Sequence, residues 1–271
     1  MNVSLNSRGS DFWFLYPPAV GELQARQKLR ESSPSKALAM RPEFDCYGDR
    51  IPTMRLVDRL AVVPVCGPIV KGATGSDKFY YGVCSYEDIA TDLDAAAGQD
   101  IRGILLHVRS PGGTVIGAQE LASKIASMQR ELGIPIHSFT DDVCASAAEY
   151  ISAACEIRLT AGSAIVGSIG TVGISLTYEK ALQALGVEVN VFSSGALKMG
   201  TDLKDMSREQ KAFMDSFIQA RGSEFKAWME KYRGLKSEHM EGQVFAGAEA
   251  VQIGLHDATV SGIDEALEYF G

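Results

Sequence analysis

The sequence predicts an α/β protein built around a mainly parallel sheet. Beyond residue 55, short runs rich in β-branched side chains alternate with segments of helical periodicity, a pattern typical of strand–helix–strand crossovers. Residues 101–108 (IRGILLHV) form an almost unbroken apolar run, as expected for a strand covered on both faces. With 271 residues, 46% of them hydrophobic, the chain is long enough to bury a sizeable core.

Residues 1–55 differ in texture from the rest and are predicted to form an N-terminal arm. Five of the nine prolines fall in this stretch, around an amphipathic helical pattern near residues 20–30. One domain over residues 56–271 is expected to follow the arm.

The first half of that domain contains strands and helices in alternation. Each predicted strand is a run of apolar, often β-branched residues that ends at a turn signal, such as Gly67-Pro68 after the first. The first helix has Ser85 in a capping position at its start. The predicted elements are, in order, strand 60–65, helix 85–97, strand 101–108, helix 118–132 and strand 134–140.

The second half adds shorter elements and one long helix. Ser207 and Gln210 make a capping box at the start of the long helix. Aromatic side chains recur along it at helical spacing, which indicates packing against the core or against another subunit. These aromatic residues are Phe213, Phe217, Phe225, Trp228 and Tyr232. The predicted elements are helix 146–154, strand 156–160, strand 171–177, helix 178–185, strand 187–193, helix 207–233 and helix 263–270.

Composition excludes several classes of function. A net charge of −8 and a pI near 5.1 leave no clustered excess of Lys and Arg, so no nucleic-acid partner is expected. No apolar run approaches the roughly 20 residues of a membrane span, and the first residues lack the order of a secretory signal. The five cysteines include no C-x-x-C pair and no histidines at metal-ligand spacing. We therefore expect a cytoplasmic protein with reduced thiols, no membrane span, no metal and no cofactor.

The four histidines do not support the commonest hydrolytic machinery. His107 and His137 lie inside apolar strands and are interpreted as core residues, whereas His239 and His256 lie in polar surroundings near the C-terminus. The chain contains neither H-E-x-x-H nor G-x-S-x-G. A Ser-His-Asp triad can form from residues distant in sequence, but nothing local favours one.

Two segments offer groups suited to acyl transfer. Residues 110–113 (SPGG) end a buried strand, and glycines there let a backbone N–H approach a substrate, as an oxyanion hole requires. Taken alone, this motif is more often a plain turn. Ser146 begins a helix of small residues, a position where serine is usually only an N-cap. The N–H groups of the helix start, that of Ala147 first, also favour a developing oxyanion.

A serine nucleophile needs a base, and residues 193–200 (SSGALKMG) offer one. A lysine accepts a proton near neutral pH only if its pKa falls from about 10.4 toward 7 or 8, and burial among apolar groups supplies that shift. Lys198 lies among small and apolar residues, whereas Lys204 lies between two aspartates that would keep it charged. Lys198 is therefore the better candidate for the base.

Together these segments resemble the signal peptide peptidase A (SppA) family of Ser-Lys peptidases, in the Clp protease/crotonase superfamily. The resemblance covers about residues 56–260. It rests on the order strand, SPGG, helix, strand, SAAEYISAACEIRLTAGSAIVGSIGTVG, then SSGALK and a long helix, with GQVFAG at residues 242–247 resembling the family's C-terminal turn. It implies a ClpP/crotonase-like superhelical repeat of ββα units with a mainly parallel sheet, plus the N-terminal arm and the long C-terminal helix.

The resemblance also implies roles for individual residues. Ser146 would be the nucleophile and Lys198 the general base of a serine endopeptidase that works through an acyl-enzyme. Ser168 falls where family members have a serine that orients the lysine; its other interpretation is a plain loop serine. The N–H groups of the oxyanion hole would come from Gly112 or Gly113 and from Ala147. No cofactor or metal is implied.

Partners and location follow from the same resemblance. Family members can draw the serine and the lysine from different protomers of a ring-like oligomer, so a homo-oligomer with shared active sites and a polypeptide substrate is implied. The segment WFLYPP before the first helical pattern resembles tailed-phage members. We therefore expect a prohead or capsid-maturation protease that processes scaffold or leader peptides in the host cytoplasm or the prohead interior. The alternative is a soluble bacterial SppA-type peptidase.

Glu149 departs from the family pattern, in which glycine or an aromatic residue is more common. Its carboxylate is expected to face solvent or another subunit; if it faced Lys198, it would hold the lysine protonated and impair the base. Two other functions stay open. One is a crotonase-type acyl-CoA enzyme, for which Glu149 and Glu156 are the nearby acid/base candidates, and the other is an inactive scaffold component with the same fold.

Overall fold

The structure is a computed structural model that describes residues 13–15, 53–75, 77–78, 82–198 and 202–271. The helical pattern near residues 20–30, and most of the predicted N-terminal arm, lie outside the described residues. The elements are β1 (Trp13–Leu15), β2 (Arg55–Val57), β3 (Leu60–Cys66), β4 (Ile69–Val70), β5 (Cys84–Ser85), α4 (Tyr86–Ala97), β6 (Gly103–Arg109), β7 (Gly112–Thr114), α5 (Ala118–Leu132), β8 (Ile136–Thr140), β9 (Val143–Ala145), α6 (Ala147–Ser152), β10 (Arg158–Thr160), β11 (Ile165–Gly167), α7 (Glu179–Ala184), α8 (Arg208–Arg233), a 3₁₀ turn (Ser237–His239), β12 (Val244–Ala246), α9 (Gly247–Gln252), β13 (Ala258–Thr259) and α10 (Ile263–Glu268).

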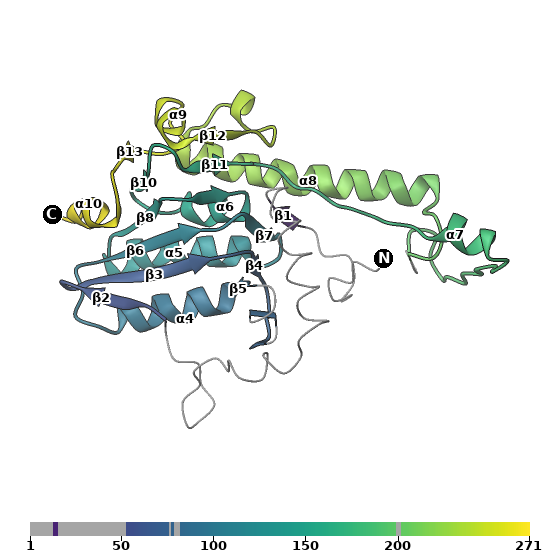
Figure 1. Cartoon of the computed structure of the whole chain (residues 1–271), viewed down its shortest axis with the longest axis horizontal. Helices are drawn as coiled ribbons and strands as arrows, with labels where there is room; N and C mark the ends of the chain where they lie inside the picture. The colour runs from purple at the N-terminus through teal and green to yellow at the C-terminus, as the bar shows by residue number, and fades with distance from the viewer. Residues whose placement is uncertain (1–12, 16–52, 76, 79–81, 199–201) are drawn as a thin grey trace, which may run out of the picture.

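A mainly parallel six-stranded sheet forms the centre of the molecule (Figure 1). Its strand order is β13-β10-β8-β6-β3-β2, and every neighbouring pair is parallel except β2 with β3. Parallel neighbours need a crossover between them, and the intervening helices provide it. The predicted α/β class is confirmed.

Two of the crossovers repeat the same unit. A long strand of the central sheet is followed by a short strand and then by a helix, as in β6-β7-α5 and β8-β9-α6. The short strands join two smaller sheets, of order β1-β7-β4-β5 and β12-β11-β9. This is the ββα repeat that the resemblance predicts, and it places the ends of several strands at one edge of the sheet.

The two faces of the central sheet are buried by different elements. Ile104 and Leu106 of β6 lie in the larger core cluster with the apolar sides of α4 and α5. Leu105, between them, points to the other face and meets Phe139 and Ala266 of α10. This alternation is the period-two geometry of a strand, and burial on both faces explains why residues 101–108 are so apolar.

The three sheets and the helices packed on them are called the body below. Beyond β11, the chain extends away from the body (Figure 1). The predicted strands at residues 171–177 and 187–193 are wrong: among the described residues of that stretch, α7 is the only regular element. α8 begins there and runs back to the body (Figure 1). Its predicted capping box is present, but only its second half is well covered, since Phe225 and Met229 are buried while Phe213 is 43% exposed.

None of the helices in the described ranges combines the length and the apolarity needed to cross a membrane.

Candidate active site

Ser146 lies at a sharp turn between β9 and α6. Its φ of 58° and ψ of −117° lie outside the regions that L-residues normally adopt, a strain of about 1–3 kcal/mol at such positions. The residue is 1% exposed. Its N–H donates to the Gly167 carbonyl over 2.7 Å, which ties the turn to β11. A conformation of this kind persists only where the surrounding structure holds it.

The SPGG motif lies directly beside β9, the strand that leads to this turn. The Ala145 N–H donates to the Ser110 carbonyl over 3.0 Å. Gly113 passes so close to β4 that a Cβ there would lie 1.7 Å from the Ile69 carbonyl oxygen. The motif and the candidate nucleophile are therefore neighbours, and Gly113 cannot be replaced without moving β4.

The N–H groups predicted for an oxyanion hole differ in how they are bonded. Gly112 has a φ of 106°, and its N–H donates to the Ser110 hydroxyl over 3.2 Å. Ala147 is the first residue of α6, where an N–H has no acceptor within the helix. The helix geometry alone leaves the Ala147 N–H available to a substrate. The Gly112 N–H must first break its hydrogen bond to the Ser110 hydroxyl.

Ser168 follows β11 and has the second unusual backbone in this region. Its φ is 54°, and its N–H donates to the Gln243 carbonyl over 2.7 Å. Because Ser146 bonds to the carbonyl of Gly167, the residue just before Ser168, the two serines lie on adjacent turns. The structure therefore brings together Ser146, Ser168 and the SPGG motif.

Lys198 is not brought to these residues within one chain. It lies exposed between α7 and α8, where its carbonyl accepts a hydrogen bond from Gln210 Nε2 over 3.4 Å. The helix that Ser146 begins packs near the other end of α8, where the Trp228 indole N–H donates to the Tyr150 carbonyl over 3.0 Å. At a rise of about 1.5 Å per residue, roughly 27 Å of helix lie between Gln210 and Trp228. The serine and the lysine of one chain therefore lie toward opposite ends of α8.

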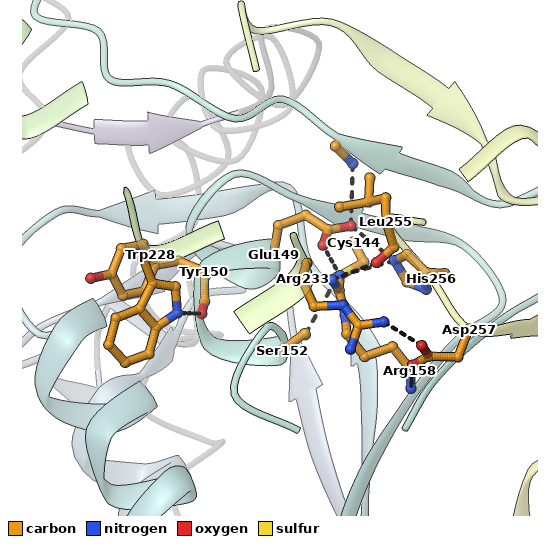
Figure 2. Close-up of polar contacts among 11 residues, drawn as sticks. Cys144, Glu149, Tyr150, Ser152, Arg158, Trp228, Arg233, Leu255, His256 and Asp257 are labelled. Carbon is orange, nitrogen blue, oxygen red and sulfur yellow. Dashed lines mark hydrogen bonds and ion pairs between the residues drawn. The ribbon is translucent and has the colours of Figure 1, made fainter. Parts of the chain in front are cut away.

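Glu149 does not face solvent, another subunit or Lys198, which corrects the expectation from sequence. Its side chain is completely buried, and Oε2 is ion-paired with Arg158. Oε1 accepts the Gly167 N–H over 3.2 Å and lies 3.1 Å from His256 Nε2 (Figure 2). A carboxylate is buried only where an opposite charge and donors meet it, and these come from other segments of the chain.

Arg158 is the centre of this buried network. Its Nη1 donates to the Leu255 carbonyl over 2.6 Å, and its backbone N–H donates to the Asp257 carboxylate over 2.7 Å. Asp257 is also ion-paired with Arg233 of α8. Burial, with a smaller effect of the Arg233 charge, lowers the pKa of Arg158 to about 9, which leaves the guanidinium charged at neutral pH. Two carboxylates and two guanidinium groups therefore balance in charge.

His256 lies inside the same network and is 2% exposed. Burial, followed by the charges of Arg158 and Arg233, lowers the pKa of His256 well below its usual range, so the imidazole is neutral at neutral pH. Its Nε2 then bonds either Arg158 or Glu149, according to the tautomer.

Sequence analysis did not single out Arg158, Asp257 or Arg233. One local signal was present, because Arg158 is a charged residue between Ile157 and Leu159 in a predicted strand, and a buried strand admits a charge only with a partner. Its two carboxylate partners lie 9 and 99 positions away in sequence. No local pattern identifies partners at such separations.

Cys144, Glu149 and His256 form a group with metal-ligand spacing in the part of the chain that the structure describes. Two features argue against a metal ion there. The Arg158 guanidinium already pairs with the carboxylate, and burial raises the pKa of the Cys144 thiol to about 11, which keeps it protonated at neutral pH. We interpret the three residues as members of the buried network.

Comparison with known proteins bears directly on this site. Residues 128–269, just over half of the chain, match the model of peptidase family S49. The head-tail preconnector protein GP5 of Enterobacteria phage P21 is 30% identical over 245 residues, which is 88% of this chain and 48% of that protein. The capsid assembly protease C of Escherichia phage lambda is 31% identical over 215 residues, 78% of this chain and 48% of that protein. A putative signal peptide peptidase SppA of Enterococcus faecium is 32% identical over 162 residues, 58% of this chain and 47% of that protein.

This chain spans about half the length of these curated relatives. The family match includes the positions of Ser146, Ser168 and Lys198. The resemblance to SppA-like peptidases and their phage members is therefore confirmed, and the chain belongs to peptidase family S49.

Proposed function

We propose that this chain is a serine endopeptidase of the Ser-Lys type, with Ser146 as nucleophile and Lys198 of a neighbouring protomer as general base. Membership of family S49 supports a peptidase. The finer assignment depends on one observation: Ser146 is buried, strained in its backbone, and placed beside the SPGG motif and Ser168. A serine held on a strained strand-to-helix turn is a recurrent arrangement for a hydrolase nucleophile.

Two observations support a lysine supplied by a second copy. Within one chain the serine and the lysine lie far apart along α8, and Lys198 is exposed, whereas a lysine base needs an apolar site. We call residues 171–206 the lysine arm. Its described part also exposes several large apolar side chains, as a surface covered by another subunit does. The most exposed are Phe192 (95%), Leu185 (78%) and Ile174 (76%). In the proposed assembly, the lysine arm packs against the Ser146 region of a second copy and becomes buried there.

In the proposed reaction, Lys198 takes the proton of the Ser146 hydroxyl while the oxygen attacks the peptide carbonyl carbon. The resulting oxyanion accepts hydrogen bonds from the Ala147 N–H and from one SPGG glycine, each worth about 3 kcal/mol. The C–N bond then breaks, the leaving amine takes the proton from Lys198, and the acyl group stays on Ser146. Lys198 then takes a proton from a water molecule, whose oxygen attacks the acyl carbon. The ester bond to Ser146 breaks, the proton passes from Lys198 to the Ser146 oxygen, and the acid is released. Ser168 orients the lysine by a hydrogen bond.

We also propose that residues 1–55 form an arm and residues 56–271 the peptidase domain. β2 begins at Arg55, which is at this boundary. β1 pairs antiparallel with β7, with Phe14 opposite Gly113. The edge of β7 thus accepts an extended chain beside the SPGG glycines, which supports strand pairing as the mode of substrate binding.

The biological role we propose is capsid assembly in a phage or prophage, with scaffold or leader peptides as substrates in the host cytoplasm or the prohead interior. The names of the two phage relatives, a capsid assembly protease and a head-tail preconnector protein, support it. The alternative is a bacterial peptidase that acts on signal peptides, as the name of the Enterococcus relative suggests.

Casein cleavage by purified variants tests the enzyme assignment. Wild type is compared with Ser146→Ala and Lys198→Ala, and Lys204→Ala is the matched control because it removes another exposed lysine of the same arm. Wild type and the control are expected to cut, the other two variants are not, and all four should assemble alike by light scattering. Equal cleavage by all four proteins would overturn the assignment.

A fluorophosphonate reagent separates this proposal from its rivals. An adduct on Ser146, located by mass spectrometry, is expected only of a serine hydrolase. A crotonase-type enzyme would need a free carboxylate at the site, but Glu149 is ion-paired in the core and Glu156 is exposed. An inactive scaffold component predicts no adduct. Absence of labelling on an assembled wild-type protein would favour that rival.

A further inference from the structure

We propose that Glu149 is a positioning residue for the nucleophile: its carboxylate holds the Gly167 peptide and, through that peptide, the strained turn at Ser146. The inference rests on the proposed function, because it gives that turn a catalytic purpose. Glu149 lies in the first turn of α6, three residues after Ser146. Side chains of a helix lean toward its N-terminus, so the carboxylate returns to the level of the turn.

Two consecutive hydrogen bonds connect the carboxylate to the nucleophile. Glu149 Oε1 accepts the Gly167 N–H over 3.2 Å, and the Gly167 carbonyl accepts the Ser146 N–H over 2.7 Å. Gly167 itself has a φ of 112°, and a Cβ there would lie 2.8 Å from the Gln243 carbonyl oxygen. The last residue of β11 is therefore held on one side by the carboxylate, and it holds the nucleophile on the other.

The other oxygen of the Glu149 carboxylate is also bonded, and this fixes the position of the side chain. Arg158 pairs with Oε2, and the same guanidinium donates to the Leu255 carbonyl (Figure 2). Arg158 is anchored in turn through Asp257, which is ion-paired with Arg233 of α8. The side chains of Glu149 and Arg158 are both 0% exposed, so water does not compete for these bonds. Leu255 and Asp257, more than a hundred positions away in sequence, thereby help to hold the turn at Ser146 in place.

Stability alone does not account for this arrangement. A buried ion pair can often be replaced by apolar residues of similar volume without loss of stability. What the carboxylate adds is an acceptor for one particular N–H, that of the residue bonded to Ser146. A displacement of about 1 Å at a reacting group can cost about 100-fold in rate, so a fixed Gly167 peptide has catalytic value.

Two double variants separate the positioning role from a purely structural one. Glu149→Gln/Arg158→Met and Glu149→Leu/Arg158→Met both remove the two charges together, so neither leaves a buried charge unpaired. Glutamine keeps an oxygen that can accept the Gly167 N–H, whereas leucine, of similar size, has none. The readout is the rate of fluorophosphonate adduct formation on Ser146, in protein whose melting temperature and oligomeric state match those of wild type. We expect the glutamine variant to stay within about threefold of wild type and the leucine variant to be about 10-fold to 100-fold slower.

Glu149→Asp is the second test, and it applies even if the double variants do not fold. It keeps the charge opposite Arg158 but draws the carboxylate back by one carbon, roughly 1.5 Å, from the Gly167 N–H. We expect the labelling rate and kcat on casein to fall about 10-fold while KM stays unchanged.

The outcomes distinguish the two proposals. Equal labelling of all folded variants would overturn the positioning role and leave the network a structural feature. If wild type itself is not labelled on Ser146, the proposed function fails first, and this inference fails with it.

Discussion

The two halves of the proposed catalytic pair lie in regions of opposite character. The turn at Ser146 is complete within one chain, because the residue is 1% exposed and its backbone is hydrogen-bonded to Gly167 of β11. The lysine arm, residues 171–206, has one short helix and large exposed apolar side chains in its described part. The first region is held by the core, whereas the second has a surface that a second copy would bury. A chain of this kind can fold with an ordered nucleophile and still need assembly to become active.

Mixing two inactive variants tests directly whether the serine and the lysine of one site come from different protomers. Ser146→Ala and Lys198→Ala are each expected to lose about 1,000-fold or more of casein cleavage, because the members of a catalytic set depend on one another. After subunit exchange, a mixture should recover a measurable fraction of wild-type activity, since the serine of one chain meets the lysine of the other. A mixture of Ser146→Ala with Ser146→Ala/Lys198→Ala is the inactive control. Native mass spectrometry monitors the subunit exchange. If activity does not recover although subunits exchange, both residues of a site belong to one protomer.

Alanine substitutions of two phenylalanines, one in the core and one on the lysine arm, should differ in their effect on stability. Phe139 is 0% exposed in the core and Phe192 is 95% exposed on the lysine arm. Phe139→Ala should lower the free energy of unfolding by about 3–5 kcal/mol, because it leaves a cavity. Phe192→Ala should change it by less than about 0.5 kcal/mol in dilute protein, yet weaken assembly and casein cleavage. Urea denaturation and light scattering measure both effects, and a large loss of stability from Phe192→Ala would show that the arm is covered within its own chain.

The buried network predicts that stability falls in mild acid. Burial, then the charges of Arg158 and Arg233, lowers the pKa of His256 well below 6.5 in the folded state. Below about pH 6.5, His256 is therefore protonated in the unfolded chain but not in the folded chain. The free energy of unfolding should decline by up to about 1.4 kcal/mol for each unit by which the pH is lowered. His256→Gln should flatten this slope but not abolish it, since burial also lowers the pKa of His107 and of His137. An unchanged slope in urea titrations of the variant would exclude His256 as its source.

A modest effect is expected of the exposed ion pair between Arg109 and Asp141. Hydrogen bonds from the Arg109 guanidinium lower the pKa of Asp141 to about 2. Its stabilisation is therefore present above about pH 4 and is lost as the pH falls toward 2. Because the pair is partly exposed, Asp141→Asn should cost only about 1 kcal/mol at pH 7, with the difference from wild type shrinking as the pH falls through about 2 and vanishing below it. Asp142→Asn, a change at the neighbouring exposed carboxylate, is the control and should leave urea unfolding nearly unchanged.

Local patterns predicted the body of the fold well and the lysine arm poorly. The apolar run at residues 101–108 is found as β6 (Gly103–Arg109), and the capping box of α8 is present as predicted. The strands predicted at residues 171–177 and 187–193 are not found. Both segments have the β-branched, apolar composition of strands, but a strand forms only where a neighbouring edge supplies hydrogen bonds. In the arm these side chains face outward instead.

Local sequence patterns were enough to infer the family, the α/β class and the candidates Ser146, Ser168 and Lys198, because strand ends, helix starts and glycine turns are encoded by neighbouring residues. The folded structure was needed to show that Ser146 and Lys198 of one chain lie apart and that Glu149 is buried. Its partners Arg158 and His256 are 9 and 107 positions away in sequence. A buried charge is settled by the groups that surround it in space, and these are defined only when the whole chain has folded.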